Sequence, residues 1–265
     1  MSTYVISDIH GCCNEFLSML EKICFSESDN LILAGDYIDR GKQSYEMLKW
    51  MEQCPPNVLI LRGNHEEEFV SSVDLMQSVD RIEKLNTDFS SHMDTAALYE
   101  SVKYLLRQKM LPAVYFDLYS TIGILLGQNH VTLYDLCRWA EAIHRMPYHW
   151  EAEIAGRNYI VVHAGYTDSL ENISRWFDSL EQFFLYAREE SLQLGGAVHS
   201  TIIAGHTPTT VRESFAYNAG TVFRYYDARK DCVFYDIDCG CVFRERNLEA
   251  RLACIRLEDE KIFYV

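Results

Sequence analysis

The chain has 265 residues, with 39 acidic and 24 basic side chains, and a formal net charge of −15. An acidic surface of this size argues against a nucleic-acid binder and against docking on anionic membranes, because both need a basic footprint. The length and the 48% share of hydrophobic residues fit a single globular domain over 1–265. No apolar run reaches about 18 residues, so no membrane span is expected.

The N-terminus and the cysteines indicate the cellular compartment in which the protein is expected. A strand is predicted from residue 3, which leaves no room for a secretory signal, so we expect a cytoplasmic protein. The nine cysteines are scattered along the chain, and reduced thiols are the expectation. The pairs Cys12-Cys13 and Cys239-x-Cys241 lack a second pair at zinc spacing, so neither predicts a metal or redox site.

The first 65 residues alternate between short apolar strands and helices. Strands are predicted over 3–6, 31–34 and 58–61, with helices for which Asn14 and Ser44 are the candidate N-caps. Each strand runs directly into polar residues: Asp8 and His10, then Asp36 and Asp39, then Asn64 and His65. Because the carboxyl ends of strands in an open α/β sheet share one edge, these side chains are expected to converge on one crevice.

The segment from about 70 to 147 has a helical pattern. Apolar residues recur at three-residue spacing from Val70 to Ile82, and a second stripe covers 98–106. Thr132 and Asp135 form a capping-box pattern ahead of a third helix. We therefore predict a mostly helical insertion on the rim of the crevice.

The alternating pattern resumes after the insertion. Strands over 159–162 and 201–204 end at His163 and His206, and a helix is predicted between them over 179–192. Three aromatic residues of this helix are expected in the core: Phe183, Phe184 and Tyr186. The C-terminal residues are typical of an antiparallel hairpin.

Seven residues that follow predicted strands have the chemistry of metal ligands. All offer oxygen or nitrogen and none is a thiol, which suits manganese, iron or zinc. Seven ligands are too many for one ion and about right for two, and two ions about 3.5–4 Å apart form a clamp for phosphoryl transfer. Asp36 is the candidate bridge, because its two oxygens can reach both ions. The seven are Asp8, His10, Asp36, Asn64, His65, His163 and His206.

The order and spacing of these blocks resemble the calcineurin-like metallophosphoesterases. Two strings, Gly35-Asp36-x-x-Asp39-Arg40 and Gly63-Asn64-His65-Glu66, are similar to hallmarks of the phosphoprotein phosphatases, the family of Ser/Thr phosphatases, in its compact bacterial and phage-type members. The resemblance covers about 1–69 and 158–245 and leaves out the insertion. It implies an α/β fold in which two packed mixed β-sheets are flanked by helices, an α/β/β/α sandwich.

The resemblance also implies the ligands of two divalent metal ions. The first ion would be held by Asp8, His10 and Asp36. The second would share Asp36 and add Asn64, His163 and His206. Manganese is the first expectation for both ions, with iron or zinc as alternatives. A hydroxide that bridges the ions would attack phosphorus in line.

Four further residues take catalytic roles under the resemblance. His65, oriented by Asp39, would protonate the leaving oxygen. Arg40 and Arg188 would bind the phosphoryl oxygens, because a planar guanidinium suits phosphate. The alternative for Arg188 is an exposed helix arginine that pairs with a glutamate.

We expect from the resemblance a metal-dependent phosphomonoesterase, namely a Ser/Thr phosphatase acting on a phosphorylated protein or peptide. The alternative is a symmetrical dinucleoside tetraphosphatase, or another enzyme for a small phosphoester, on the same scaffold. Those relatives usually lack an acid at Asp39 and carry Asp in place of Glu66, which favours the Ser/Thr phosphatase. A helical insertion that narrows the crevice would favour small substrates. A metal-bound scaffold without activity is a third hypothesis, although no catalytic group is missing.

Overall fold

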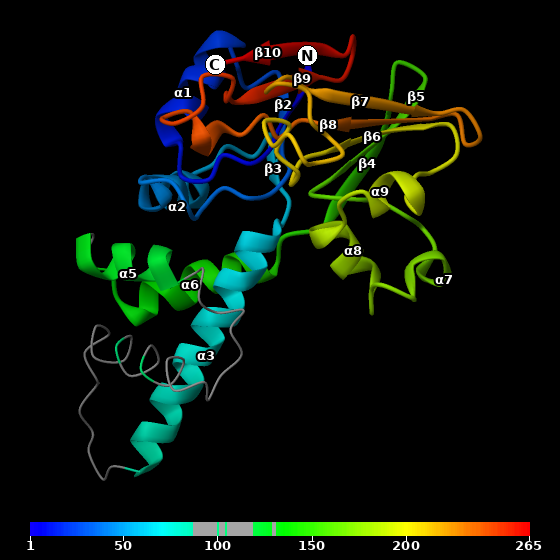
Figure 1. Cartoon of the computed structure of the whole chain (residues 1–265). Helices are drawn as coiled ribbons and strands as arrows, with labels where there is room; N and C mark the ends of the chain where they lie inside the picture. Colours follow the sequence, from blue (N-terminus) through cyan, green and yellow to red (C-terminus); the bar gives the residue numbers. More distant parts are fainter. Residues whose placement is uncertain (87–99, 101–103, 105–118, 129–130) are drawn as a thin grey trace.

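The computed structural model describes residues 1–86, 100, 104, 119–128 and 131–265. Two five-stranded β-sheets lie face to face, and helices cover their outer faces (Figure 1). One sheet has the order β10-β9-β1-β2-β3 and the other the order β4-β5-β6-β8-β7. This architecture confirms the α/β sandwich with two mixed sheets. No helix in the described part of the chain is long and apolar enough to cross a membrane.

The first sheet has three parallel strands and an antiparallel hairpin. The parallel strands are β1 (Thr3–Ile6), β2 (Asn30–Leu33) and β3 (Val58–Ile60). The hairpin is β9 (Ala253–Arg256) and β10 (Lys261–Tyr264), which confirms the predicted C-terminal pairing. The connecting helices are α1 (Cys13–Lys22) and α2 (Ser44–Glu52).

The two predicted helix caps are wrong in detail. Cys12 takes the N-cap position of α1, and Asn14 lies inside the helix. Ser44 is the first residue of α2, and its hydroxyl accepts a hydrogen bond of 3.0 Å from the backbone amide of Asp39. The Ser44 hydroxyl therefore bonds to the loop before α2 instead of capping the helix.

The second sheet has parallel strands in its centre and antiparallel strands at both edges. Its strands are β4 (His149–Ile154), β5 (Arg157–Val162), β6 (Ser200–Ala204), β7 (Phe223–Asp227) and β8 (Cys232–Asp236). Strands β5, β6 and β8 pair in parallel. The short helices near it are α7 (Leu170–Ile173), α8 (Leu180–Tyr186) and α9 (Glu190–Gln193).

The single helix predicted over 179–192 is instead two helices. Helix α8 ends at Tyr186, and the next residue, Ala187, has extended backbone angles. The break places Arg188 between α8 and α9, with its side chain turned toward His206. Phe183 and Phe184 are core residues as predicted, but Tyr186 is 38% exposed, so its placement in the core is wrong.

The core forms three layers because each sheet is covered on both faces. Along β1, Val5 points into the layer between the sheets, while Tyr4 and Ile6 pack under the helices. Strands buried on both faces are expected to be continuously apolar. Val161 of β5 meets Val5 in the layer between the sheets, and its neighbour Val162 packs in the third layer, beside α7 and α8.

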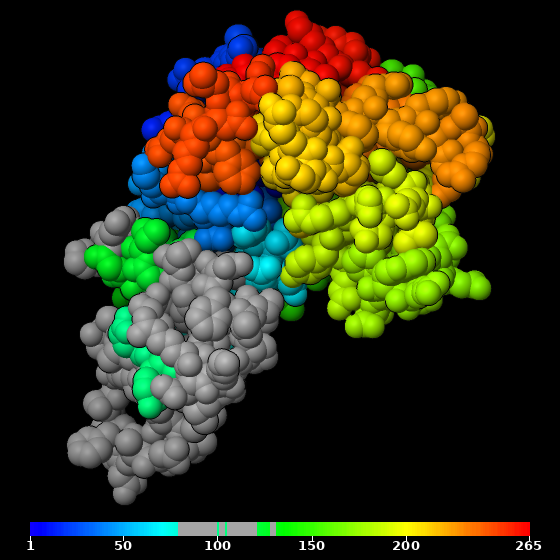
Figure 2. Space-filling model, in the orientation of Figure 1, coloured from blue at the N-terminus to red at the C-terminus, as the bar shows by residue number. Residues whose placement is uncertain are grey.

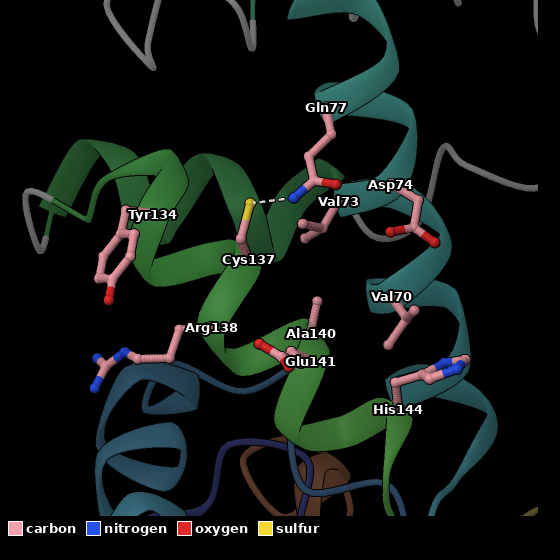
Figure 3. A pocket seen from close by; sticks show the side chains of 10 residues that line it. All are labelled: Val70, Val73, Asp74, Gln77, Tyr134, Cys137, Arg138, Ala140, Glu141 and His144. Carbon is pink, nitrogen blue, oxygen red and sulfur yellow. Dashed lines mark hydrogen bonds between the residues drawn. The ribbon is translucent and has the colours of Figure 1, made fainter. Parts of the chain in front are cut away.

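Within the helical segment after β3, one long helix extends away from the sandwich and two shorter helices lie beside α2 (Figure 1). The described helices of this segment are α3 (Asn64–Asn86), α5 (Tyr119–Gln128) and α6 (Leu133–His144). Val70, Val73 and Met76 of α3 are buried, which confirms the predicted stripe as far as Met76, and Thr132 with Asp135 caps α6 as the predicted capping box. The side chains of Val79 and Ile82 lie outside the described residues. The stripe predicted over 98–106 lies outside the described residues. A groove of about 440 Å³ lies between α3 and α6, which are in contact (Figure 3).

Candidate metal centre and active site

The candidate site lies where strands of both sheets end. Strands β1, β2 and β3 end just before Asp8, Asp36 and Asn64. Strands β5 and β6 of the other sheet end just before His163 and His206. Parallel strands present their carboxyl ends at one edge of each sheet, so the two sheets bring their loops together.

One group of candidate ligands surrounds the side chain of Asn64. Its Oδ1 lies 3.0 Å from Nε2 of His163 and 2.9 Å from Nδ1 of His206. Oδ1 of Asp36 lies 3.4 Å from the same nitrogen of His163. The other ring nitrogen of His163 lies 2.9 Å from the carbonyl of Ala34, an interaction that aims Nε2 at the group. These atoms could bind one cation.

A second group lies on the other side of Asp36. Oδ2 of Asp36 lies 3.4 Å from Nε2 of His10 and 3.8 Å from Nε2 of His65. Nδ1 of His10 lies 3.1 Å from the carbonyl of Ile38, which orients this ring in the same way. Asp8 accepts the backbone amide of His206 at 3.0 and 3.2 Å, so the two ligand loops are in direct contact. Asp36 therefore presents one oxygen to each group.

The remaining predicted residues form a contact chain beside Asp36. Nδ1 of His65 lies 2.9 Å from Oδ2 of Asp39, and Nε2 of His65 lies 3.0 Å from a guanidinium nitrogen of Arg40. The other oxygen of Asp39 accepts a hydrogen bond from the hydroxyl of Thr121 on α5. Sequence reasoning missed Thr121, because a single threonine in a helical segment carries no motif. The structure thus brings a residue of the helical segment to His65.

Arg188 lies at the His206 side of the site. Its guanidinium is 3.4 Å from the carbonyl of His206 and 3.4 Å from the hydroxyl of Thr207. Its backbone amide donates to the side chain of Glu190, but its guanidinium turns to the site instead. Arg188 thus lies beside His206 of the first ligand group, whereas Arg40 lies beside His65.

Five buried carboxylates interact in and around the site. They are Asp8, Asp36, Glu66, Asp236 and Asp238. Burial raises the pKa of Asp8 to about 6, and burial together with Asp8 raises the pKa of Asp238 well above its ordinary value. Oδ2 of Asp236 has no hydrogen-bond partner among the described residues. Uncompensated buried negative charge is costly, so the donor set fits divalent cations, which would compensate it.

The imidazoles support the same conclusion. Burial lowers the pKa of His10 to about 3 and that of His206 well below its ordinary value, so both rings are neutral and able to bind a metal. Burial opposes the charged form of Asp36, but the histidines around it, with His163 first, lower its pKa overall. An ionised carboxylate beside the neutral ring of His10 is the donor chemistry of manganese, iron or zinc.

Glu66 supports the backbone of the ligand loops. Its carboxylate accepts the amides of Asp36 at 2.8 Å, Tyr37 at 2.9 Å and Gly63 at 3.0 Å. Burial, with Asp36 as the second cause, raises the pKa of Glu66 to about 7. The hallmark string contained Glu66, but its role as a link between the loops after β2 and β3 needed the structure.

Backbone angles in these loops are unusual. Six of the predicted site residues have positive φ between 45° and 73°: Asp8, His10, Asp36, Asp39, Arg40 and His206. Residues other than glycine rarely adopt this left-handed region, and such strain concentrates at functional sites. The loops are held in tight turns that direct the side chains to one point.

The site contains two groups of ligands joined by one aspartate, and a histidine–aspartate pair and two arginines lie beside them. These are the features of a metal-dependent phosphoester hydrolase. The chain belongs to the calcineurin-like phosphoesterase family, whose model matches residues 1–235. It is therefore a metallophosphoesterase.

Similar proteins carry one particular activity in their names. A symmetrical bis(5'-nucleosyl)-tetraphosphatase of Aliivibrio fischeri is 31% identical over 147 residues, which are 54% of this chain and 52% of that protein. Another, from Buchnera aphidicola subsp. Baizongia pistaciae, is 39% identical over 93 residues, 35% of this chain and 34% of that protein. The matches thus span between a third and about half of these relatives.

A solved structure supports the fold. The metallophosphoesterase of Sphaerobacter thermophilus aligns with a TM-score of 0.51 at 10% identity, over 100% of this chain and 87% of that chain. At this identity the likeness concerns the fold alone.

Proposed function

We propose that this protein hydrolyses dinucleoside polyphosphates and cleaves diadenosine tetraphosphate symmetrically into two molecules of ADP. The names of the relatives favour this activity, which was the alternative in the sequence analysis, over the expected Ser/Thr phosphatase. The observation that carries phosphoester hydrolysis is Asp36, whose two oxygens face His163 on one side and His10 on the other.

Two metal ions are assigned to these groups, with manganese as the first choice. Asp8, His10 and Asp36 would hold one ion, and Asp36, Asn64, His163 and His206 would hold the other. Bound there, the ions would supply an activated water and neutralise charge on the phosphoryl oxygens.

The protein's own residues would then orient the substrate and move the proton. Arg40, beside His65, and Arg188, beside His206, would hold the phosphoryl oxygens. Nδ1 of His65 is held by Asp39, and Nε2, which lies 3.0 Å from Arg40, would protonate the leaving phosphate oxygen. Symmetrical cleavage makes a nucleoside diphosphate the leaving group.

A substrate comparison tests the proposal. The protein with manganese is assayed on diadenosine tetraphosphate, a phosphoserine peptide and an aryl phosphate, with D36N as the inactive control. We expect kcat/KM for the dinucleotide to exceed that for the peptide at least about 100-fold, with ADP as the sole nucleotide product, because remote binding energy favours the fitting substrate. Faster turnover of the peptide would refute the proposal.

A Ser/Thr phosphatase is the second candidate. It is favoured by the acid at Asp39, placed 2.9 Å from His65, and by Glu66 in place of aspartate. The same comparison decides between the two activities.

A further inference from the structure

Two cysteines and a glutamate meet beside the candidate metal centre. Cys12 caps α1, Glu15 lies in its first turn, and Cys241 begins the short 3-10 helix η2 (Cys241–Phe243). The two sulfur atoms and one carboxylate oxygen all lie within 4.8 Å of one another. Cys241 is buried, whereas Cys12 and Glu15 are half-buried and reachable from solvent.

The fold brings these residues together from opposite ends of the chain. Cys12 and Glu15 are three residues apart, so they share one face at the start of α1. Gly240, with a positive φ of 73°, turns the chain into η2 and presents Cys241 to that face. Figure 2 shows the orange-red segment that contains η2 lying against the blue segment of the first helices.

The geometry and the donor types suit a tetrahedral zinc ion. Zinc–sulfur bonds of about 2.3 Å place neighbouring ligand atoms about 3.5–4 Å apart. The three observed ligand atoms, all within 4.8 Å of one another, need only a small contraction to reach that range. The guanidinium of Arg244 contacts one oxygen of Glu15. Such a contact orients a carboxylate while its other oxygen remains available to a metal.

The surroundings leave room for a fourth ligand. Cys12 and Glu15 line a pocket of about 440 Å³, whose walls also include Arg40, Lys42 and Arg244. Three protein ligands with an open position toward a pocket are typical of zinc sites that exchange water or a small ligand.

We propose that Cys12, Glu15 and Cys241 bind a divalent zinc ion, at a site separate from the two groups around Asp36. Thiol ligands select zinc, whereas the oxygen and nitrogen ligands around Asp36 suit manganese, so the two sites would hold different metals. The zinc site would join the start of α1, two residues after His10, to η2. A disulfide between the cysteines is the competing outcome, and Glu15 would then pair with Arg244 alone.

Cobalt is the probe, because a thiolate bound to cobalt gives a charge-transfer band that oxygen and nitrogen ligands do not give. Reduced, metal-free protein is titrated with cobalt and then with zinc. We expect the band to appear with one equivalent of bound cobalt and to disappear when zinc displaces it. C12S and C241S should each lose the band, and E15Q should weaken cobalt binding about tenfold or more, as ligand changes commonly do.

Matched controls separate this result from general loss of fold. C24S changes an exposed cysteine outside the cluster and should keep the band. Circular dichroism checks each variant, and C12S, at the more accessible position, stands in if C241S does not fold. Metal analysis should show one zinc fewer in C12S and unchanged manganese.

Two results would overturn the proposal. One is a wild-type protein with no charge-transfer band, or with a band that persists in C241S. The other concerns protein that binds no cobalt through sulfur. If hydrogen peroxide removes only these two thiols from it, and a Cys12–Cys241 disulfide is mapped, the cysteines form a redox pair and no zinc site.

Discussion

The hydroxyl of Thr121 on α5 donates a hydrogen bond to Asp39, and the other oxygen of Asp39 lies 2.9 Å from His65. The side chains of Thr121 and Asp39 are both buried, at 3% exposure each. Although burial opposes ionisation, the hydrogen bonds from His65 and Thr121 lower the pKa of Asp39 to about 2. The helical segment after β3 therefore takes part in holding the candidate general acid.

The Thr121 contact predicts a catalytic role for α5. T121V keeps the shape and removes the hydroxyl, and a hydrogen bond to a charged group is worth about 1.5–3 kcal/mol. We expect kcat on an aryl phosphate to fall about tenfold or more while KM changes less than about twofold. T121S should restore most of the activity. Equal kcat for T121V and wild type would show that Asp39 needs no support from α5.

The His65–Asp39 pair predicts dependence on the leaving group. H65N should lower kcat about 10²–10⁴-fold on diadenosine tetraphosphate, the usual size of a general-acid contribution. The loss should be much smaller on an aryl phosphate with an acidic phenol, because that leaving group needs no proton. Bound metal, measured by elemental analysis, should stay unchanged. Equal losses on both substrates would contradict a role in protonation.

The ligand groups predict how metal content responds to single substitutions. D36N should reduce bound manganese at both positions, because Asp36 faces both groups. N64A should lose about one ion, since Asn64 contacts only His163 and His206 among the predicted ligands for which contacts are described. H199A is the control, because the His199 side chain is 76% exposed and pairs with Asp231 away from the site. Wild-type metal content in D36N would exclude the assignment.

Glu66 predicts a stability effect at a residue that binds no substrate. In the wild type, backbone amides donate to the Glu66 carboxylate. E66Q puts an amide group in its place, which lowers the free energy of unfolding by about 1–3 kcal/mol. For a chain of this size we expect Tm to fall by about 3–10 °C. E21Q changes an exposed glutamate of α1 and should leave Tm within about 1 °C. A thermal melt of both variants makes the comparison.

Gly205 predicts sensitivity to a single methyl group. A Cβ at this position would collide with the carboxylate of Asp8 and the hydroxyl of Ser7. G205A should therefore displace Asp8 and lower manganese affinity at least about tenfold, measured by titration calorimetry. G127A is the control, because a Cβ on that helical glycine would meet no atom of the described residues, and alanine there should stabilise α5 by up to about 1 kcal/mol. Unchanged affinity in G205A would show that Asp8 is not a ligand.

Much of the site could be predicted because its ligands follow strands directly. A strand's alternation is visible in the sequence, and parallel strands end at a common edge, so Asp8, Asp36 and Asn64 had to lie close together. Arg188 was harder to place, because its position depends on a helix break at Ala187 that the apolar pattern of 179–192 conceals. For the substrate the two sources differ: Asp39 and Glu66 favour a protein phosphatase, whereas the names of the relatives favour a dinucleotide, which is the proposed substrate.

The fold class and the residue types of the candidate metal centre could be predicted without a structure, because both follow from local spacing along the chain. Tertiary structure alone decided the contacts between distant segments. Thr121 reaches Asp39 only because α5 packs beside the sandwich, and Cys12 meets Cys241 only because η2 folds onto the start of α1. Such contacts have no signature in spacing, since the packing of whole elements, rather than the neighbours of a residue, sets the distance.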